Sequence, residues 1–219
     1  RALQGVAASM LSPVALAIVV AATPDRADLA ALGPAARVVE RLEVAGVAQG
    51  GGPQADAEAA LPERPQGAQE RSTEVTASHR KTDPESCLEV LRIGPTYDEL
   101  ITDRVASATT AWYVQTDGGR QISVGIDSFP DEIGPDLLDR AGAALGECSA
   151  FSMTGLGDTG HFDDRLWADG RPAPTLGDQG FAVRVTQLAQ QDRKTVRLYN
   201  DYLVVRAGHN LITVTVSHW

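Results

Sequence analysis

Serine, histidine and aspartate are all present, but their spacing does not indicate a hydrolase. A catalytic triad of this kind needs its nucleophile on a strained turn, as in Gly-x-Ser-x-Gly. The nearest run is Gly125-Ile126-Asp127-Ser128, at the end of an alternating strand pattern. We therefore expect no catalytic residue. A secreted hydrolase with an unrecognised site is the alternative to a binding function.

The histidines and aspartates do not have the spacing of a metal site. The four histidines are scattered between residues 79 and 218, with no His-x-x-x-His or Cys-x-x-Cys pair that would favour zinc. Four aspartates lie between residues 158 and 169, without the Asp-x-Asp-x-Asp-Gly spacing of a calcium loop. We expect a solvated acidic loop there, and neither a metal nor a cofactor.

A set of aromatic and arginine residues indicates binding. Rings and guanidinium groups in one groove would suit a small amphipathic or anionic ligand. The predicted groove residues are Trp112, Tyr113, Trp167, Arg184 and Arg206, with Phe162 and Arg197 as further candidates. The alternative is that the rings fill the core while the arginines pair with acidic residues on a solvated sheet face.

The charge balance argues against nucleic acid as a partner. The chain has 29 Asp and Glu against 19 Lys and Arg, which gives a net charge of -10. Proteins bind phosphate backbones through clustered Lys and Arg, and no such cluster occurs in this sequence.

The elements that must position these residues are organised around Cys87 and Cys148, the only two cysteines. Asp83-Pro84 predicts the start of a helix with Asp83 as its N-cap, and Gly94-Pro95 predicts its end. Cys87 then lies on the apolar face of that helix, which points it into a core.

A second helix is predicted to open at Pro130, shortly before Cys148. Its apolar residues recur at helical spacing and form one stripe, and Gly146 suits the left-handed position after its end. The stripe consists of Ile133, Leu137, Leu138, Ala141 and Leu145.

The state of the two thiols depends on the compartment. They can form a disulfide, a buried reduced pair or two unrelated thiols. Residues 1–24 carry no charge after Arg1 and contain the apolar run 16–22, which is typical of a signal peptide or a marginal membrane anchor. An Ala-rich buried helix is the alternative. Export favours a Cys87–Cys148 disulfide in a protein that is secreted or anchored in the cell envelope and meets the membrane only through this segment.

Alternating apolar residues predict an antiparallel sheet. We expect a hairpin, a short strand, a long loop and then further strands joined by short turns. The hairpin spans 106–126 around a turn at 116–119, the short strand 149–153 and the loop 154–180, and later strand patterns cover 181–186, 196–199, 203–205 and 212–216 around a turn at 207–210.

These patterns predict an α+β domain, with two helices packed on one face of the sheet, one disulfide, and a polar or groove-lining second face that could form a ligand cleft. We expect this domain to span residues 57–219. A connector or linker at 25–56, which includes Gly50-Gly51-Gly52-Pro53, separates it from the apolar segment.

The order of motifs resembles a known family. The matching stretches are 83–91, 137–151, Leu176-Gly177-Asp178 and 203–216. Together they resemble the extracellular sensor domain of actinobacterial serine/threonine kinases of the PknH type, a domain also found in envelope lipoproteins. The resemblance implies an extracytoplasmic, non-enzymatic sensor or ligand-binding domain with a cleft for an unidentified ligand. The kinase sensor has a second disulfide, for which this chain lacks cysteines. A partner-binding structural envelope protein is a further alternative.

Overall fold

The computed structural model of the chain describes residues 57–58, 60–61, 69–70, 80–92, 100–114, 120–157, 160–191 and 194–219. The predicted apolar segment 1–24, the linker 25–56, the helix end at 94–95 and the hairpin turn at 116–119 lie outside these residues. Within them, no helix is long and apolar enough to cross a membrane.

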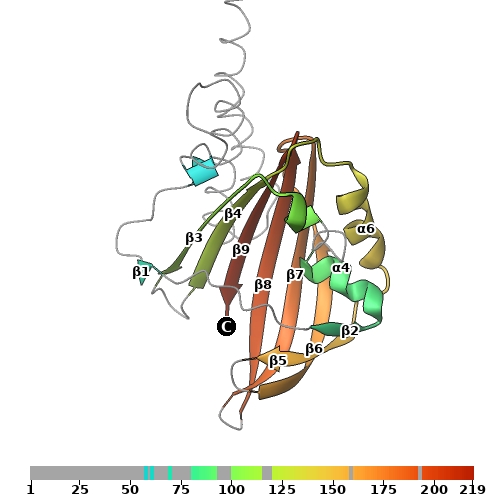
Figure 1. Cartoon of the computed structure of the whole chain (residues 1–219). Helices are drawn as coiled ribbons and strands as arrows, with labels where there is room; N and C mark the ends of the chain where they lie inside the picture. The colour runs from blue at the N-terminus through green and yellow to red at the C-terminus, as the bar shows by residue number, and fades with distance from the viewer. Residues whose placement is uncertain are drawn as a thin grey trace, which may run out of the picture.

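The strands of the described residues form one antiparallel sheet of nine strands, in the spatial order β1-β3-β4-β9-β8-β7-β6-β5-β2. Most neighbours in this order also follow one another in sequence, as short turns require. Figure 1 shows the sheet fanning out from β1 at one edge to β2 at the other. The strands are β1 (Gln69–Glu70), β2 (Lys81–Asp83), β3 (Ala106–Val114), β4 (Arg120–Ser128), β5 (Phe151–Gly157), β6 (Gly160–Arg171), β7 (Gln179–Gln191), β8 (Lys194–Ala207) and β9 (Asn210–His218).

Two α-helices pack on the same side of this sheet, which we call the helix face. They are α4 (Leu88–Arg92), preceded by the 3-10 turn η1 (Glu85–Cys87), and α6 (Asp136–Ala144); a further 3-10 turn, η2, spans Ile101–Asp103. Figure 1 shows α4 and α6 in front of the half of the sheet that holds β5 to β8. The predicted α+β class, with two helices on one face, is therefore confirmed.

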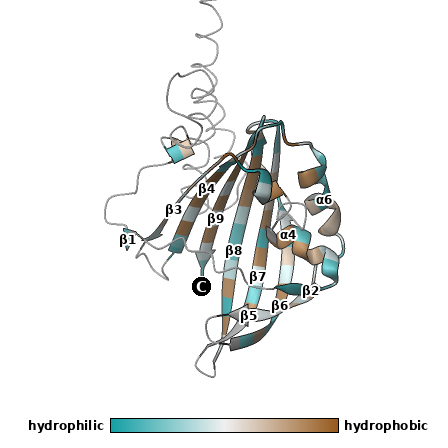
Figure 2. Cartoon of the chain, in the orientation of Figure 1, coloured by the Kyte–Doolittle hydropathy of each residue, from teal (hydrophilic) through white to brown (hydrophobic). Residues whose placement is uncertain are grey.

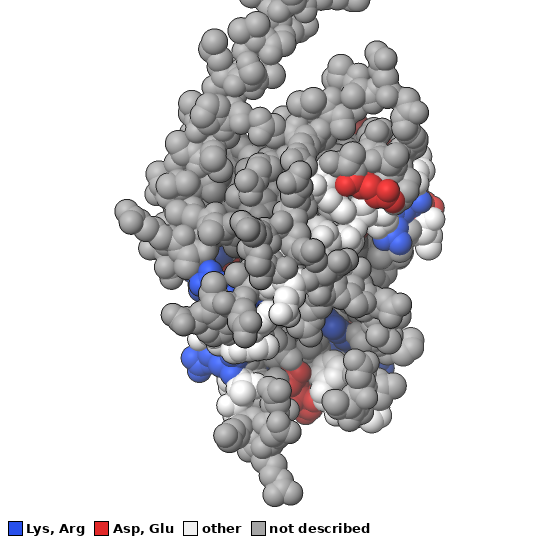
Figure 3. Space-filling view, turned by 90° about the vertical axis from the view of Figure 1, so that its left-hand side faces the viewer, with Lys and Arg blue, Asp and Glu red and all other residues white. Residues whose placement is uncertain are grey.

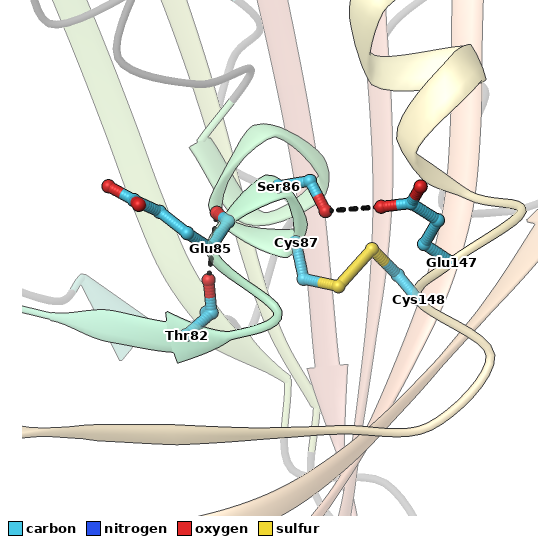
Figure 4. Close-up of a disulfide and its surroundings, with 6 residues drawn as sticks. All are labelled: Thr82, Glu85, Ser86, Cys87, Glu147 and Cys148. Carbon is cyan, nitrogen blue, oxygen red and sulfur yellow. Dashed lines mark hydrogen bonds between the residues drawn. A yellow bond between two sulfur atoms is a disulfide. The ribbon is translucent and has the colours of Figure 1, made fainter.

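A disulfide joins these two helical elements. The sulfurs of Cys87, at the end of η1, and Cys148, just after α6, are bonded, and both residues are fully buried. Figure 4 shows the bridge beside a hydrogen bond in which the Ser86 hydroxyl donates to Glu147 Oε2 at 2.8 Å. The expected Cys87–Cys148 disulfide is therefore confirmed, and it joins the two helical elements covalently.

The first hydrophobic core lies between the helices and the helix face of β5 to β9. The apolar stripe of α6 packs there against alternating strand residues, so strands and helix bury complementary surfaces. Its members include Cys87, Val90, Ile133, Leu137, Leu138, Ala141, Cys148, Phe151, Leu166, Phe181, Val183, Val185, Val204 and Leu211.

A second core lies on the opposite face of the sheet, over β3, β4, β9 and β8. Neighbouring residues of one strand contribute to different cores: Val204 belongs to the first, and Leu203 and Val205 belong to the second. Figure 2 shows the resulting alternation of apolar and polar residues along the long strands. The second core includes Ala57, Ala60, Ala106, Ala108, Trp112, Val124, Ile126, Leu203, Val205, Ile212 and Val214.

Both predicted helix starts are placed differently in the structure. Asp83 is not the N-cap, because its pairing with Ser152 holds it in β2; Pro84 takes that position, without a side-chain cap. The second helix begins at Asp136, not at Pro130. The backbone N–H groups of Phe129 and Ile133 donate to carbonyl groups of the β8–β9 turn, so this stretch docks on the sheet before the helix starts.

The end of α6 also differs from the prediction. Gly146 is not left-handed; among the described glycines only Gly177 and Gly208 have positive φ. The N–H groups of Glu147 and Cys148 instead donate to the carbonyls of Ala144 and Leu145, three residues back. These tight turns continue the helical path and deliver Cys148 to its partner.

The predicted long loop 154–180 is mostly strand. β5 extends to Gly157 and β6 occupies 160–171. Its glycines and aspartates are typical of a loop, but Leu166 and Ala168 alternate with exposed residues and fill the first core. Likewise, the patterns at 196–199 and 203–205 belong to the single strand β8, so Arg197 and Arg206 do not lie on successive strands.

The Leu176-Gly177-Asp178 motif fixes the entry into β7. The Asp178 N–H donates to the carbonyl of Arg206 at 2.8 Å, and the Gly208 N–H donates to Asp178 Oδ2 at 2.6 Å. Gly177 has a φ of 59°, and a Cβ there would press on the carbonyl oxygen of Arg206 and lie 2.9 Å from Val205 Cγ1. Only glycine fits this position.

Removal of the disulfide should destabilise the domain strongly. The bridge spans 61 residues, and a loop of this size is worth roughly 4 kcal/mol by chain entropy. We expect the Cys87→Ser/Cys148→Ser variant to lose this free energy of unfolding in urea titrations. Peptide mapping without reduction should recover the linked cysteine peptides; two alkylatable thiols in the native protein would contradict the bridge.

Two glycine substitutions should separate crowding from backbone strain. Gly208 has a φ of 58° with no atom within 4 Å of the place a Cβ would take, whereas Gly177 has the contacts described above. We expect Gly208→Ala to cost about 1 kcal/mol for the left-handed backbone, and Gly177→Ala about 3 kcal/mol in total with overpacking. Thermal melts measure both; equal losses would show that the Gly177 turn has room for a side chain.

Candidate functional site

The structure divides the five predicted groove residues between two sides of the sheet. Paired residues of neighbouring strands point to the same side. Trp112, Trp167 and Arg184 lie on the face opposite the helices. Tyr113 and Arg206 lie on the helix face, where Arg206 Nη1 donates to the carbonyl of Ile133 at 2.9 Å. The five residues therefore do not line one groove.

Trp112 is a core residue. Its side chain is 0% exposed and packs in the second core. Trp112 and Arg184 occupy the same row across the sheet, but the register places four strand spacings between them, about 19 Å. Phe162 packs half-buried against the first core.

Arg206 and Tyr113 take other positions on the helix face. Arg206 lies 3.7 Å from Asp178 Oδ2, so its guanidinium group joins the loop before α6 to the turn before β7. Tyr113 is half-buried near the sheet edge, opposite Gln69 of β1. Arg206 therefore supports the structure.

The remaining predicted residues, Trp167 and Arg184, belong to a surface that we call the aromatic–arginine face. It lies opposite the helices on β6, β7 and β8. The register sets Arg165, Leu188 and Arg197 in one row, and Trp167, Thr186 and Tyr199 in the next. The face consists of Arg165, Trp167, Arg184, Arg197 and Tyr199.

Arg184 and Tyr199 are held in place by their neighbours. Arg184 forms a bidentate ion pair with Asp201, in which Nε donates to Oδ1 at 2.6 Å and Nη2 donates to Oδ2 at 2.8 Å. Its Cζ lies 5.9 Å from the centre of the Tyr199 ring, which in turn stacks on His218 with 5.2 Å between ring centres. The charge of Arg184 is thus compensated, and the rings form a pre-organised stack.

Arg165 and Arg197 differ from Arg184 because both are exposed and neither forms an ion pair with another described residue. Trp167, two positions after Arg165, is 36% exposed. Asp169 pairs with Arg171, and Asp164 points to the other side of the sheet, which leaves the exposed Asp163 as the acidic residue nearest to Arg165 on this face of β6. Two uncompensated cations therefore flank an exposed indole and Leu188.

Figure 3 shows the distribution of charge on one side of the molecule. On the side of the molecule shown in Figure 3, the described basic and acidic side chains lie in small separate groups. The described residues on this side therefore form no continuous basic surface.

The carboxyl groups of Asp164 and Glu89 are partly removed from solvent. Burial raises the pKa of Asp164, and the hydrogen bond from Gln187 Nε2, 2.7 Å long, acts in the opposite direction. Burial also raises the pKa of Glu89, while the nearby Arg140 charge lowers it. Among the described residues, no three His, Cys, Asp or Glu side chains gather as metal ligands would.

The hydroxyl groups of several serines are used structurally. Ser86 donates to Glu147, Ser128 to Asn210 and Ser217 to Asn200. His209 is exposed in the β8–β9 turn, as predicted for a turn residue. These serines therefore have carboxylate or amide partners where a hydrolase nucleophile would need a histidine.

Sequence reasoning missed Arg165, Tyr199 and His218. Because residues 154–180 were expected to form a loop, the alternation of the exposed Arg165 with the buried Leu166 in β6 was not interpreted as a strand pattern. Treating 160–171 as a strand would have placed Arg165 and Trp167 on one side, because residues two apart share a face. Tyr199 and His218 meet only through the β8–β9 register, which a single strand pattern does not specify.

Substitution of the two predicted tryptophans should have opposite consequences. Trp112→Ala removes a fully buried ring and should lower the free energy of unfolding by about 3–5 kcal/mol. Trp167→Ala should change it by less than about 1 kcal/mol, since that ring lies on the surface. Urea titration of both variants checks this expectation. A folded, fully stable Trp112→Ala protein would show that this ring does not support the core.

No protein-family model and no curated protein matches this chain. The solved structures similar to it include the following two. For the crystal structure of the extracellular domain of PknH from Mycobacterium tuberculosis, the TM-score is 0.45 at 12% sequence identity, over 69% of this chain and 75% of that one. For the structure of an Rv0999 ortholog from Mycobacterium smegmatis, it is 0.34 at 16% identity, over 69% and 66%. The sequence motifs resembled this same type of domain, but similarity at this level does not transfer a function to the chain.

Proposed function

We propose that this chain is an extracytoplasmic, non-enzymatic ligand-binding domain of the sensor type, which binds a small anionic amphiphile on the aromatic–arginine face. The observation that carries the proposal is the pair of exposed arginines, Arg165 and Arg197, beside the exposed ring of Trp167. Uncompensated cations on a protein with a net charge of -10 favour an anionic ligand.

The geometry suits an amphiphile with one anionic group. Arg165 and Arg197 are two strand spacings apart, about 10 Å at the backbone, so two arginine side chains can converge on one phosphate or carboxylate. Trp167 and Leu188 lie beside them and offer apolar surface for the rest of the ligand.

The stack next to the two arginines lowers the cost of binding. Asp201 and Tyr199 already fix the guanidinium group of Arg184, and His218 fixes the Tyr199 ring. A surface whose side chains are ordered before the ligand arrives loses less conformational entropy on binding.

The disulfide supports a location outside the cytoplasm. Structural disulfides persist in oxidising compartments and are rare where thiols are kept reduced. The Cys87–Cys148 bridge is buried and connects the two helical elements, so it belongs to the fold. We propose that the apolar segment at residues 1–24 directs export or anchors the domain in the cell envelope.

Charge removal on the face should weaken binding. With dodecyl phosphate below its micelle concentration as the probe, we expect Arg165→Gln/Arg197→Gln to raise the Kd about tenfold in isothermal titration, because two charge-assisted contacts are lost. Arg171→Gln is the matched control on the same strand, since Arg171 is exposed but already pairs with Asp169.

Three results would contradict the proposal. They are an absence of dodecyl phosphate binding, an affinity that the double variant leaves unchanged, and an equal loss in the Arg171→Gln control. Inorganic phosphate and dodecyltrimethylammonium should bind more weakly than the anionic amphiphile, since each lacks one of its two features. Native mass spectrometry of the purified chain would show whether a natural ligand of this class co-purifies.

A further inference from the structure

The helix face of β3, β4 and β9 carries mainly uncharged polar side chains. These strands lie beside the part of the sheet that α4 and α6 cover, as Figure 1 shows. Most residues that point to this side are hydroxyl or amide residues, which we call the hydroxyl-rich face. It consists of Thr109, Tyr113, Gln121, Ser123, Thr213 and Thr215.

Pairing between the strands sets these residues side by side. Ser123 lies opposite Thr215, and Gln121 lies opposite both Tyr113 and Ser217. Gly125 lies between Thr109 and Thr213 and has no side chain, so the surface is lower at this position. A Cβ there would have only the Thr109 hydroxyl within 4 Å, at 3.5 Å. All three strands therefore contribute polar side chains to this face, and Ala111 and Gly125 are its apolar positions.

The hydroxyl-rich face has no charge in three consecutive rows, from Tyr113 to Thr109 along β3. The charged pair Arg104–Asp127 begins only in the next row. On the opposite side of the same sheet, the row through Arg184 has aspartates on both neighbouring strands. The aromatic–arginine face of this sheet thus carries charged side chains, whereas the three rows of the hydroxyl-rich face carry none.

The polar side chains of this face are not used in hydrogen bonds within the described part of the chain. None of its six side chains forms a hydrogen bond with another described residue, whereas Ser217 at its margin is bound to Asn200 at 2.7 Å. Five of the six are half-buried, and Thr109 is exposed. Partly desolvated hydroxyl and amide groups without partners favour a ligand that can both donate and accept hydrogen bonds.

Two tyrosines lie at the margins of the face. Tyr113 presents a half-buried ring on β3, whereas Tyr202, opposite Thr215 on β8, packs against the first core and closes the face on that side. Burial raises the pKa of Tyr202, with the Arg80 charge acting against it, so its phenol is neutral at neutral pH. A tyrosine ring combines an apolar surface with a hydrogen-bonding hydroxyl.

We propose that the hydroxyl-rich face binds an uncharged oligosaccharide. Sugars have many hydroxyl groups and apolar ring faces, which match the uncharged donors and acceptors of the face and the half-buried ring of Tyr113. On the three rows of β3, β4 and β9, a charged ligand would lose hydration without meeting an oppositely charged side chain of these strands. Across β3, β4 and β9 the face spans about 10 Å, and along the strands it spans about 14 Å, enough for a short oligosaccharide.

Titration of the full chain with neutral hexasaccharides of glucose (α-1,4 and β-1,4), mannose, galactose and arabinose tests this proposal. At least one should bind, and Thr213→Val/Thr215→Val should raise its Kd about tenfold, because valine keeps the shape of threonine but removes the hydroxyl. Thr186→Val, on β7 of the opposite face, is the matched control and should change the Kd by less than about twofold. A hyaluronan hexasaccharide, which is anionic, should bind more weakly.

The proposal is overturned if none of the neutral hexasaccharides binds, if the double variant and the control behave alike, or if hyaluronan binds best. Thermal melts check that the double variant is folded, and Ser123→Ala gives the same test with a smaller change. Arg165→Gln/Arg197→Gln should leave oligosaccharide affinity unchanged, so failure of the anionic-ligand proposal and failure of this one are distinguishable.

Discussion

One sheet buries residues on both of its sides, and this constraint organises the rest of the structure. Side chains alternate along a strand, so a strand that serves both cores must be apolar at successive positions. That is found where the cores overlap: Leu203, Val204 and Val205 in β8, and Leu211 and Ile212 in β9. Strands farther out serve one core each. β7 buries Phe181, Val183 and Val185 toward the helices, whereas β4 buries Val124 and Ile126 away from them.

The helical layer depends on the disulfide more than on the helices themselves. α4 has five residues and α6 has nine, both shorter than a helix that is stable alone in water. Their stability must come from packing on the first core and from the Cys87–Cys148 link. Arg206 and Gln179 add a second attachment at the other end of α6, because Arg206 donates to the carbonyl of Ile133 and Gln179 donates to Asp139 Oδ1.

The sequence predicted features that depend on local patterns and missed those that depend on the tertiary arrangement. The β3–β4 hairpin, the β8–β9 turn and the α6 stripe follow from alternation and helical periodicity. β6 was missed because its glycines and aspartates are typical of a loop, although its backbone pairs with strands on both sides. Trp112 and Trp167 looked equivalent in sequence, yet one fills the second core and the other is 36% exposed. Only the strand order decides such a difference.

The same two-sided sheet explains why the polar surfaces are separate and different in charge. The two cores lie on opposite sides of the sheet and on different halves of it. The aromatic–arginine face is therefore the reverse side of β6 to β8, which carry the first core. The hydroxyl-rich face is the reverse side of β3, β4 and β9, which carry the second core. A ligand on one surface therefore does not compete with a ligand on the other. Any energetic coupling between them must pass through β8 and β9, because those strands contribute to both cores. A shift of Val204 toward one core displaces Leu203 and Val205 in the other, since tightly packed interiors transmit such strain.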